Sequence, residues 1–252
     1  MPKASIYDES KIKTLSSLEH IRLRTGMYIG RLGDGSNPDD GIYILIKEVV
    51  DNSVDEFIMG AGNRIIVTVA GDTVRVRDYG RGIPLGKVID CVSTINTGAK
   101  YNDDVFQFSV GLNGVGTKAV NALSKSFKVV SYRDGRLSEA LFERGVLKSS
   151  REDSCGREKN GLLVEFSPDP DIFPEFSFNM EFLEKRMWNY ACLNSGLTLV
   201  LNGKDFVAEH GLFDLLSSEV GESALYDLGW YTGERIEFSF THTNNYGEEH
   251  FS

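Results

Sequence analysis

The sequence predicts an α/β fold, a two-layer sandwich in which a mixed β-sheet is covered on one face by helices. Short runs of alternating hydrophobicity are joined by the two-residue turns Gly71-Asp72 and Asp134-Gly135, an arrangement typical of β-hairpins. Residues 42–60 and 180–194 carry hydrophobic side chains at helical spacing, which is typical of helices that bury one side. Hairpins and amphipathic helices that share one chain predict two packed layers.

The composition excludes several classes of protein. The chain has 252 residues, of which 41% are hydrophobic, enough for one sizeable domain or one and a half. Its formal net charge of −10 gives the chain as a whole no attraction for duplex DNA, so DNA contacts would need another part of a larger protein. Cys91, Cys155 and Cys192 are scattered and odd in number, which excludes a paired disulfide framework and a CxxC metal site. No hydrophobic run approaches the ~18 residues of a membrane span, and the N-terminus has no signal or transit pattern. We therefore expect a cytoplasmic protein with no membrane partner.

The first part of the chain leads into one central helix. Residues 1–17 are polar and predict an arm that is ordered only where it docks on something. Residues 18–24 predict a short helix that stops at Gly26. A loop rich in Gly and Asp then leads to the helix at residues 42–60.

This central helix has two different faces. Residues 37–40 offer N-cap side chains, and Gly60 can end the helix. Its hydrophobic arc comprises Ile42, Ile46, Val49, Val50, Ser53 and Phe57. Its polar arc comprises Lys47, Glu48, Asp51, Asn52, Asp55 and Glu56. Glu48 and Asn52 are four residues apart and lie one above the other, so a carboxylate base and a metal-binding amide could act side by side. Taken alone, such a face is more typical of a solvated surface, by about four to one.

The remaining elements follow from the same patterns. Up to residue 117 we expect strands at 63–70 and 73–78, a turn at 78–84, a weak helix at 87–95, a polar loop at 96–109 and a helix from 117. Paired strands at 126–132 and 137–143 follow, then a charged surface loop at 149–161 and a strand at 162–168. The last elements are a helix at 180–194, a hairpin at 197–208 and a helix at 212–220. Residues 221–252 differ in style and predict the start of a further domain that is cut short. The predicted organisation is an arm at 1–17, a main domain at 18–220 and this segment.

Candidate binding residues follow the second strand. Asp78 ends a strand with buried neighbours, and a buried carboxylate needs a hydrogen-bonding partner such as the exocyclic amine of a base. A turn-capping Asp before Gly80 is about as common. Gly80 and Gly82 allow the backbone to approach a ligand closely, and Ile83 supplies an apolar wall.

A second candidate region is rich in glycine. Gly111, Gly114 and Gly116 precede a helix start, where free N–H groups can bind phosphate, although a turn for tight packing is at least as common. Lys100, in the polar loop, could reach a phosphate, although most such lysines are solvated.

Four motifs in this order resemble a known family. ExxxNxxD, then DxGxGI, a loop lysine and GLxGxG before a helix are similar to the Bergerat-fold ATPases of the GHKL superfamily. Within it, RLRTGMYIG, EVVDNSVDE, RDYGRGIP and VGLNGVGTKAVNALS resemble the ATPase region of bacterial type II topoisomerase B subunits. The resemblance covers nearly the whole chain, and NSVDE favours the topoisomerase IV type over gyrase.

The resemblance implies roles for particular residues. Glu48 matches the general base that activates water against the γ-phosphate of ATP, and Asn52 matches the Mg²⁺ ligand. Asp78 matches the acceptor of the adenine amine. Further nucleotide contacts are implied for Tyr7 on the arm, for Gly82 and Ile83 at the adenine, and for Lys100, Gly111, Leu112, Asn113, Gly114, Val115 and Gly116 in the phosphate-covering lid. Tyr7 corresponds to a tyrosine that reaches the nucleotide of the other protomer.

Four positions depart from the family pattern. Ile44 replaces a histidine one turn before the base, so any assistance to Glu48 must come from elsewhere. Asn113 resembles the residue at the same lid position of the eukaryotic type II enzymes. Leu162 replaces a threonine near the adenine, and Thr25 replaces a proline. None of these changes removes a phosphate or metal contact.

The resemblance implies ATP and Mg²⁺ as cofactors, a homodimer of B subunits that closes on ATP, an A-type DNA-cleaving subunit in an A2B2 complex, and duplex DNA bound mostly by regions outside this chain. Two alternatives remain open. A mismatch-repair or chaperone ATPase of the same superfamily is disfavoured by RTGMYIG and the GLNGVGTKAVNALS lid. A non-catalytic binding module is disfavoured because both Glu48 and Asn52 are present.

Overall fold

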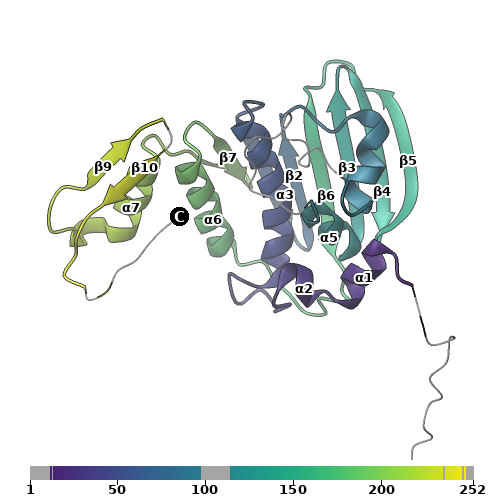
Figure 1. Ribbon diagram of the computed structural model, residues 1–252, viewed down its shortest axis with the longest axis horizontal. Helices are drawn as coiled ribbons and strands as arrows, with labels where there is room; N and C mark the ends of the chain where they lie inside the picture. The colour runs from purple at the N-terminus through teal and green to yellow at the C-terminus, as the bar shows by residue number, and fades with distance from the viewer. Residues whose placement is uncertain (1–11, 13, 98–113, 235, 246, 248–252) are drawn as a thin grey trace, which may run out of the picture.

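A computed structural model describes residues 12, 14–97, 114–234, 236–245 and 247 (Figure 1). The helices are α1 (Ser17–Leu23), α2 (Gly26–Ile29), α3 (Gly41–Ile58), α4 (Val88–Ser93), α5 (Gly116–Ala122), α6 (Met180–Leu193) and α7 (Leu212–Val220), with 3₁₀ turns η2 (Leu85–Lys87) and η4 (Gly221–Ser223). The strands are β1 (Arg64–Ala70), β2 (Thr73–Asp78), β3 (Ser124–Arg133), β4 (Arg136–Glu143), β5 (Val146–Ser154), β6 (Gly161–Pro168), β7 (Thr198–Leu201), β8 (Lys204–Phe206), β9 (Gly229–Thr232) and β10 (Glu237–Phe240).

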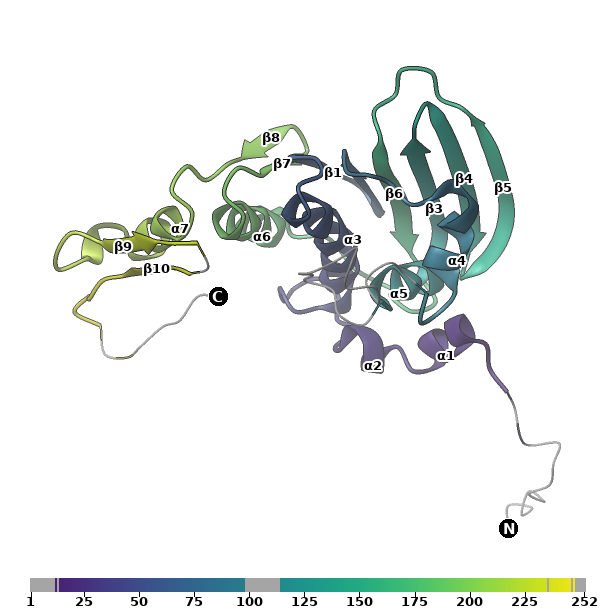
Figure 2. The same cartoon turned by 45° about the horizontal axis from the view of Figure 1, so that its top comes forward.

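The main sheet is mixed, as the sequence predicts. It has eight strands in the order β5-β4-β3-β6-β2-β1-β7-β8. The predicted hairpins β1–β2, β3–β4 and β7–β8 are antiparallel, whereas β1 and β7 run parallel because the chain crosses over through the intervening elements. Helices α1 to α6 lie on the same face of this sheet (Figure 2). The predicted two-layer sandwich is therefore confirmed.

Helix α3 forms the centre of the core between the two layers. Its apolar residues Ile42, Leu45, Ile46, Val50 and Val54 are each 0% exposed. They belong to one continuous cluster with side chains of the sheet. Burying each such side chain contributes about 1.5–3 kcal/mol, so α3 is held by packing and not by helix propensity alone.

At the start of α3, the carboxylate of Asp40 accepts hydrogen bonds from the preceding loop. Asp40 is the N-cap residue, but its side chain makes no hydrogen bond to the first turn of the helix. Instead its buried Oδ2 accepts hydrogen bonds from the N–H groups of Gly35 at 2.9 Å and Asn37 at 3.2 Å. Arg31 pairs with Oδ1 at 2.9 Å. The predicted N-cap residue type is therefore present, while its side chain orders the Gly- and Asp-rich loop.

Two expectations about local structure are wrong. Residues 149–154 belong to β5 and are not loop, because β5 pairs with β4 along its length. All nine β5 residues are exposed, so the charged sequence shows no hydrophobic alternation that would predict a strand. Cross-strand pairs stabilise β5, such as Arg151 with Glu139 at 2.9 Å. Gly26 also does not simply end a helix. Helix α1 ends at Leu23, and Gly26 begins α2.

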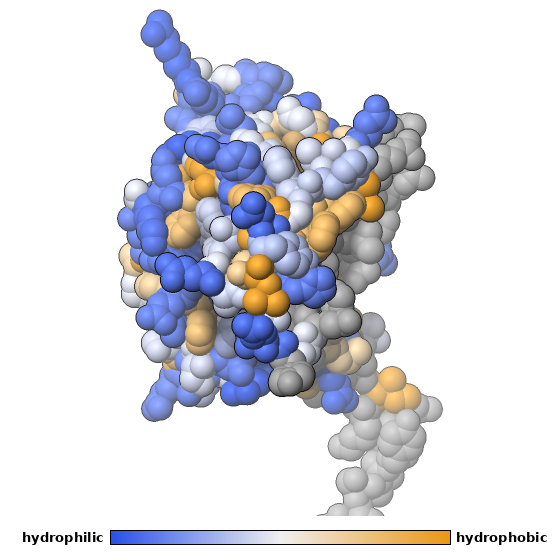
Figure 3. Space-filling view, turned by 90° about the vertical axis from the view of Figure 1, so that its left-hand side faces the viewer, coloured by the Kyte–Doolittle hydropathy of each residue, from blue (hydrophilic) through white to orange (hydrophobic). Residues whose placement is uncertain are grey.

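A small second sheet lies at one end of the molecule. Strands β9 and β10 pair with each other and pack against α7 (Figure 1). Aromatic side chains such as Tyr231 and Phe238 stack on its surface, with ring centroids 5.3 Å apart. Figure 3 shows hydrophobic and hydrophilic side chains intermixed on this end. Within the described ranges, none of the helices is both long and apolar enough to cross a bilayer.

A buried carboxylate ties α1 to the end of β6. Asp169 is 0% exposed and accepts hydrogen bonds from Arg22 at 2.6 Å and from Arg144 at 2.9 Å. Burial by itself would raise the pKa of Asp169, but the hydrogen bonds from Arg22, the backbone of Asp171 and Arg144 hold this pKa below its usual value. The ionised carboxylate is therefore part of the folded structure.

We predict that Asp169→Asn lowers the free energy of unfolding by about 1.5–3 kcal/mol, since it removes charge-assisted hydrogen bonds. The folded-state pKa lies below the ordinary value of 3.8, so this contribution is complete above that pH and is lost as the pH falls through the folded-state pKa. Urea unfolding at pH 7 and at low pH measures the difference. Asp205→Asn is the matched control, because its pair with Arg64 has side chains 54% and 44% exposed and should contribute at most about 1 kcal/mol. Equal losses in the two variants would contradict the assignment.

Candidate functional site

One face of α3 presents polar side chains on successive turns to two different parts of the chain. Glu48 and Asn52 face the start of α5, whereas Glu56 faces the turn that follows β2. Glu56 lies eight positions after Glu48, about 12 Å along a helix axis. The site is therefore an elongated surface with different chemistry at its two ends.

At the first end, α3 and α5 approach closely. A Cβ atom added to Gly116 would lie 1.7 Å from Oε2 of Glu48, so any larger residue there would displace the Glu48 carboxylate. Asn52 Nδ2 donates to the backbone carbonyl of Glu48 at 2.7 Å and to Oγ1 of Thr117 at 2.8 Å. Glu48 and Asn52 are both half-buried. The base and metal ligand expected from the sequence thus lie together, beside the start of α5.

The start of α5 is also tied to the segment before it. Lys118 is 4% exposed, and its Nζ donates to the carbonyls of Thr97 at 2.7 Å and Gly114 at 2.5 Å. Gly114 has a positive φ of 60°, which favours glycine at this bend. Val115 packs against the core. Gly116 therefore lies next to Glu48, and Lys118 ties Gly114 to the same start of α5.

At the second end, Asp78 is a buried carboxylate at the end of β2. It is 5% exposed and accepts hydrogen bonds from the N–H of Gly80 at 2.9 Å, the N–H of Leu162 at 3.1 Å and Oγ of Ser53 at 3.1 Å. Burial raises the pKa of Asp78, while these three donors act in the opposite direction. A buried carboxylate with a raised pKa costs free energy when it ionises, and such groups are concentrated at functional sites.

The turn after Asp78 is held against both layers. Glu56 accepts two hydrogen bonds from the Arg81 guanidinium, at 3.0 and 2.9 Å, and a third from the Arg81 N–H. Gly82 has a φ of 71°, and an added Cβ would lie 2.8 Å from the carbonyl oxygen of Tyr132. The carbonyl of Ile83 accepts a hydrogen bond from Ser131 at 2.7 Å. The turn predicted to contact the base is thus fixed in position.

The polar face of α3 is not a solvated surface, contrary to what the helix alone indicates. Asp51 and Asp55 are 3% and 0% exposed. Asp51 pairs with Lys47 at 2.5 Å and accepts a hydrogen bond from the hydroxyl of Tyr190 on α6. Burial and the neighbouring Asp51 carboxylate raise the pKa of Tyr190. Packing of α6 against α3 therefore buries part of the face that a helical wheel assigns to solvent.

The structure places some predicted residues and not others. Glu48, Asn52, Asp78, Gly82, Ile83, Gly114, Val115 and Gly116 line the two ends described above. The other predicted nucleotide-binding residues lie outside the described residues: Tyr7, Lys100, Gly111, Leu112 and Asn113. Their assignments remain predictions.

Residues without an individual prediction also belong to the site. Ser53 falls on the hydrophobic arc of the helical wheel, and the signal that could have identified it is a hydroxyl on an otherwise apolar face. Glu56 and Arg81 form a pair that no local pattern indicates. Thr117 is predicted only as part of a helix start.

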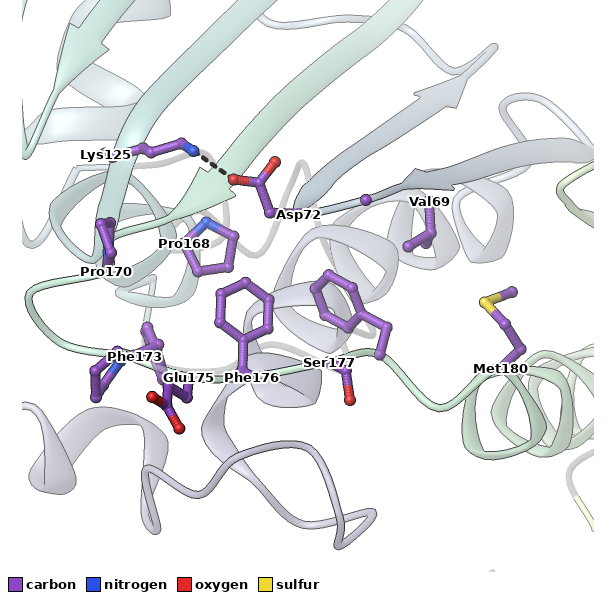
Figure 4. A pocket seen from close by; sticks show the side chains of 13 residues that line it. Val69, Asp72, Lys125, Pro168, Pro170, Phe173, Glu175, Phe176, Ser177 and Met180 are labelled. Carbon is purple, nitrogen blue, oxygen red and sulfur yellow. Dashed lines mark hydrogen bonds and ion pairs between the residues drawn. The ribbon is translucent and has the colours of Figure 1, made fainter.

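The cavity in Figure 4 lies elsewhere. It has a volume of about 590 Å³ and lies between the β1–β2 turn and the connection from β6 to α6. Phe176 and Phe178 are among its lining residues. Figure 4 shows the ion pair of Asp72 with Lys125 at its edge. None of its lining residues belongs to the site described above.

The donor set around Asn52 fits a hard cation that a ligand helps to bind. Among the residues that the structure describes, no group of three or more His, Cys, Asp or Glu side chains could hold a metal. An amide oxygen suits Mg²⁺, which usually keeps waters and binds through one or two protein oxygens together with substrate phosphates. The residues present therefore fit a magnesium–phosphate complex better than a permanent metal centre.

Comparison with known proteins identifies relatives over nearly the whole chain. Residues 37–163 match the family model of histidine kinase-, DNA gyrase B- and HSP90-like ATPases. The B subunit of DNA topoisomerase 4 from Borreliella burgdorferi is 61% identical over 99% of this chain and 42% of the relative. The B subunit of DNA gyrase from Thermotoga maritima is 35% identical over 96% of this chain and 42% of the relative.

A solved structure gives the same result at the level of the fold. The crystal structure of the 43K ATPase domain of Thermus thermophilus gyrase B in complex with an aminocoumarin matches with a TM-score of 0.74 and 31% identity. The match covers 93% of this chain and 65% of that chain. The chain spans 42% of the length of each of the two curated relatives above.

We predict that Asp78→Asn stabilises the fold by about 0.5–2 kcal/mol at neutral pH. The asparagine Oδ1 can accept from Gly80 and Leu162, and its Nδ2 can donate to Ser53, so the hydrogen bonds survive without a buried charge. Because the folded-state pKa of Asp78 is raised, the wild type loses stability as pH rises from 3.8 through the folded-state pKa. The advantage of the variant should grow over that range, as thermal unfolding at several pH values would show.

Asp72→Asn is the control for this prediction. Its hydrogen bond from Lys125 lowers the pKa of Asp72, so this variant should lose stability at neutral pH instead of gaining it. A loss of stability in Asp78→Asn above pH 7 would show that the Asp78 carboxylate is not under strain in the folded protein.

Proposed function

The chain belongs to the family of histidine kinase-, DNA gyrase B- and HSP90-like ATPases, and on this premise we propose that it binds ATP along the polar face of α3 and hydrolyses the γ-phosphate. The observation that carries this proposal is the arrangement on α3. Glu48 and Asn52 of α3 lie beside the start of α5, and Ser53 of α3 donates a hydrogen bond to the Asp78 carboxylate at the end of β2. One helix thereby supports groups for phosphate chemistry and for base recognition.

At the adenine end, Asp78 accepts a hydrogen bond from the exocyclic amine. Gly80 and Leu162 orient this carboxylate through their N–H groups. Gly82 lets the backbone approach the ring, and Ile83 packs on it. A buried acceptor that is matched only by an amine discriminates strongly against bases without one, because the mismatch leaves a polar group unsatisfied.

At the phosphate end, Glu48 acts as the general base for the attacking water. Gly114 to Gly116 let the start of α5 approach the phosphates closely. Lys100 and the lid residues Gly111 to Asn113 contact the phosphates from the lid. Asn52 would hold Mg²⁺ through its amide oxygen, and the ion supplies positive charge to the phosphates when bound. Ile44 offers no polar group to Glu48, so any assistance to the base comes from other residues; the Glu48 carboxylate lies close beside Gly116.

The whole protein proposed for this chain is a type II DNA topoisomerase B subunit of the topoisomerase IV type. The relative at 61% identity supports this type over gyrase, whose Thermotoga maritima relative is 35% identical. We propose residues 18–220 as the ATP-binding domain, 1–17 as an arm that carries Tyr7 to a second protomer, and 221–252 as the start of a transducer domain. The separate β9–β10 sheet supports this last assignment.

The partners follow from the same proposal. Two B subunits close on ATP, and an A-type subunit that cleaves DNA completes an A2B2 complex in the cytoplasm. Duplex DNA binds mostly to other regions, which agrees with the net charge of −10 on this chain.

We predict that Glu48→Gln separates binding from chemistry. The base acts on water and not on the bound nucleotide, so the affinity for a non-hydrolysable ATP analogue should change by no more than a few-fold. The rate of hydrolysis should fall by about 10²–10⁴. Calorimetry measures binding, and a single-turnover assay with excess protein measures hydrolysis. Asp78→Asn is the contrasting variant and should lose binding itself. Wild-type hydrolysis by Glu48→Gln would remove this residue from the mechanism.

The type of topoisomerase is tested on the protein that carries this segment together with the further domains of its relatives. Reconstituted with its A-type partner, it should unlink catenated DNA circles in an ATP-dependent reaction and relax supercoils without introducing them. Introduction of negative supercoils would instead identify a gyrase.

A further inference from the structure

The amide of Asn52 is held in one orientation by two acceptors. The backbone carbonyl of Glu48, 2.7 Å away, can only accept a hydrogen bond, so the group facing it must be Nδ2. The second acceptor is Oγ1 of Thr117, 2.8 Å from the same nitrogen. The two hydrogens of Nδ2 thus have two protein acceptors, and exchanging the nitrogen and oxygen of this amide would lose the bond to the Glu48 carbonyl, which cannot donate.

Only one of these two bonds comes from outside α3. The Glu48 carbonyl lies on the same helix as Asn52 and moves with it. Thr117 lies on α5, where the missing side chain of Gly116 allows the close approach to Glu48. The terminal torsion of an asparagine is broad and has no sharp preference of its own. The hydroxyl of Thr117 is therefore a contact that ties the amide to the α5 side of the site.

We propose that Thr117 is a positioning residue that directs the amide oxygen of Asn52 toward the magnesium–phosphate complex. This inference rests on the proposed function, because it assumes that Asn52 is the metal ligand. Thr117 acts through Asn52 and does not itself bind the ion. Groups that orient a metal ligand usually change metal affinity by about 10–100-fold when they are removed.

The surroundings of Thr117 allow this role to be isolated. Lys118 ties the start of α5 to Thr97 and Gly114 through its own hydrogen bonds. Ala119 and Val120 on the same helix are buried in the core. The position of α5 therefore does not depend on the Thr117 hydroxyl, and Thr117→Val removes the acceptor while nearly keeping the shape of the side chain.

The test compares the affinity for a non-hydrolysable ATP analogue in Mg²⁺ and in EDTA, measured by titration calorimetry. The dissociation constant in EDTA divided by the dissociation constant in Mg²⁺ reports the contribution of the metal. For Thr117→Val, we expect this ratio to fall by about tenfold, or to unity if it starts lower, with the affinity in EDTA unchanged within about twofold. Thr117→Ser keeps the hydroxyl and should keep the wild-type ratio. Thr117→Ala replaces Thr117→Val if thermal unfolding shows that the valine variant is misfolded.

A double variant shows whether Thr117 acts through Asn52. Asn52→Ala should itself reduce the ratio, and adding Thr117→Val to it should reduce the ratio no further. The inference is overturned if Thr117→Val keeps the wild-type ratio, if it weakens binding equally in Mg²⁺ and EDTA, or if its effect persists in the Asn52→Ala background. A wild type that binds the analogue with no dependence on Mg²⁺ overturns the inference and leaves nucleotide binding intact. A wild type that binds no nucleotide overturns the proposed function as well.

Discussion

The close packing of α3 against the sheet on one side and α5 on the other is the constraint on which the rest of the structure depends. The apolar side chains of α3 lie in a core with no room for displacement, with Ile46 and Val50 both 0% exposed. The opposite side meets α5 closely at Gly116, where any Cβ would force the Glu48 carboxylate to move. A small shift of α3 would therefore disturb the core and the site together.

This arrangement has a cost in stability at the site itself. Asp78 is a buried carboxylate with a raised pKa, and Ser53 of α3 donates a hydrogen bond to it. Natural proteins keep such groups where function needs them and offset them elsewhere. Here the offset comes from the apolar side of α3 and from partnered charges such as Asp169 with Arg22 and Arg144.

In the proposed function, the two ends of the site use different physical means to bind one nucleotide. The proposed adenine end relies on a buried acceptor fixed by backbone N–H groups, which would give specificity through the cost of an unmatched polar group. The phosphate end relies on an oriented amide oxygen, a carboxylate and a glycine-rich approach. Because both ends are built on α3, the spacing between base recognition and phosphate chemistry is set by a rigid helix and not by loops.

Much of this could be predicted from the sequence. The hairpins β1–β2 and β3–β4 follow from two-residue turns, and α3 follows from its apolar spacing, because both signals are local. The four-residue separation of Glu48 and Asn52 placed them together, and the position of Asp78 at the end of an apolar strand indicated its burial. Only the tertiary structure decided the strand order and the exposed strand β5, which depends on pairing with β4. It also decided the burial of Asp51 by α6, the bond from Ser53 to Asp78 and the bond from Asn52 to Thr117. These contacts join residues from 25 to 139 positions apart, and local periodicity states which side of an element is apolar but not which distant side chain will face it.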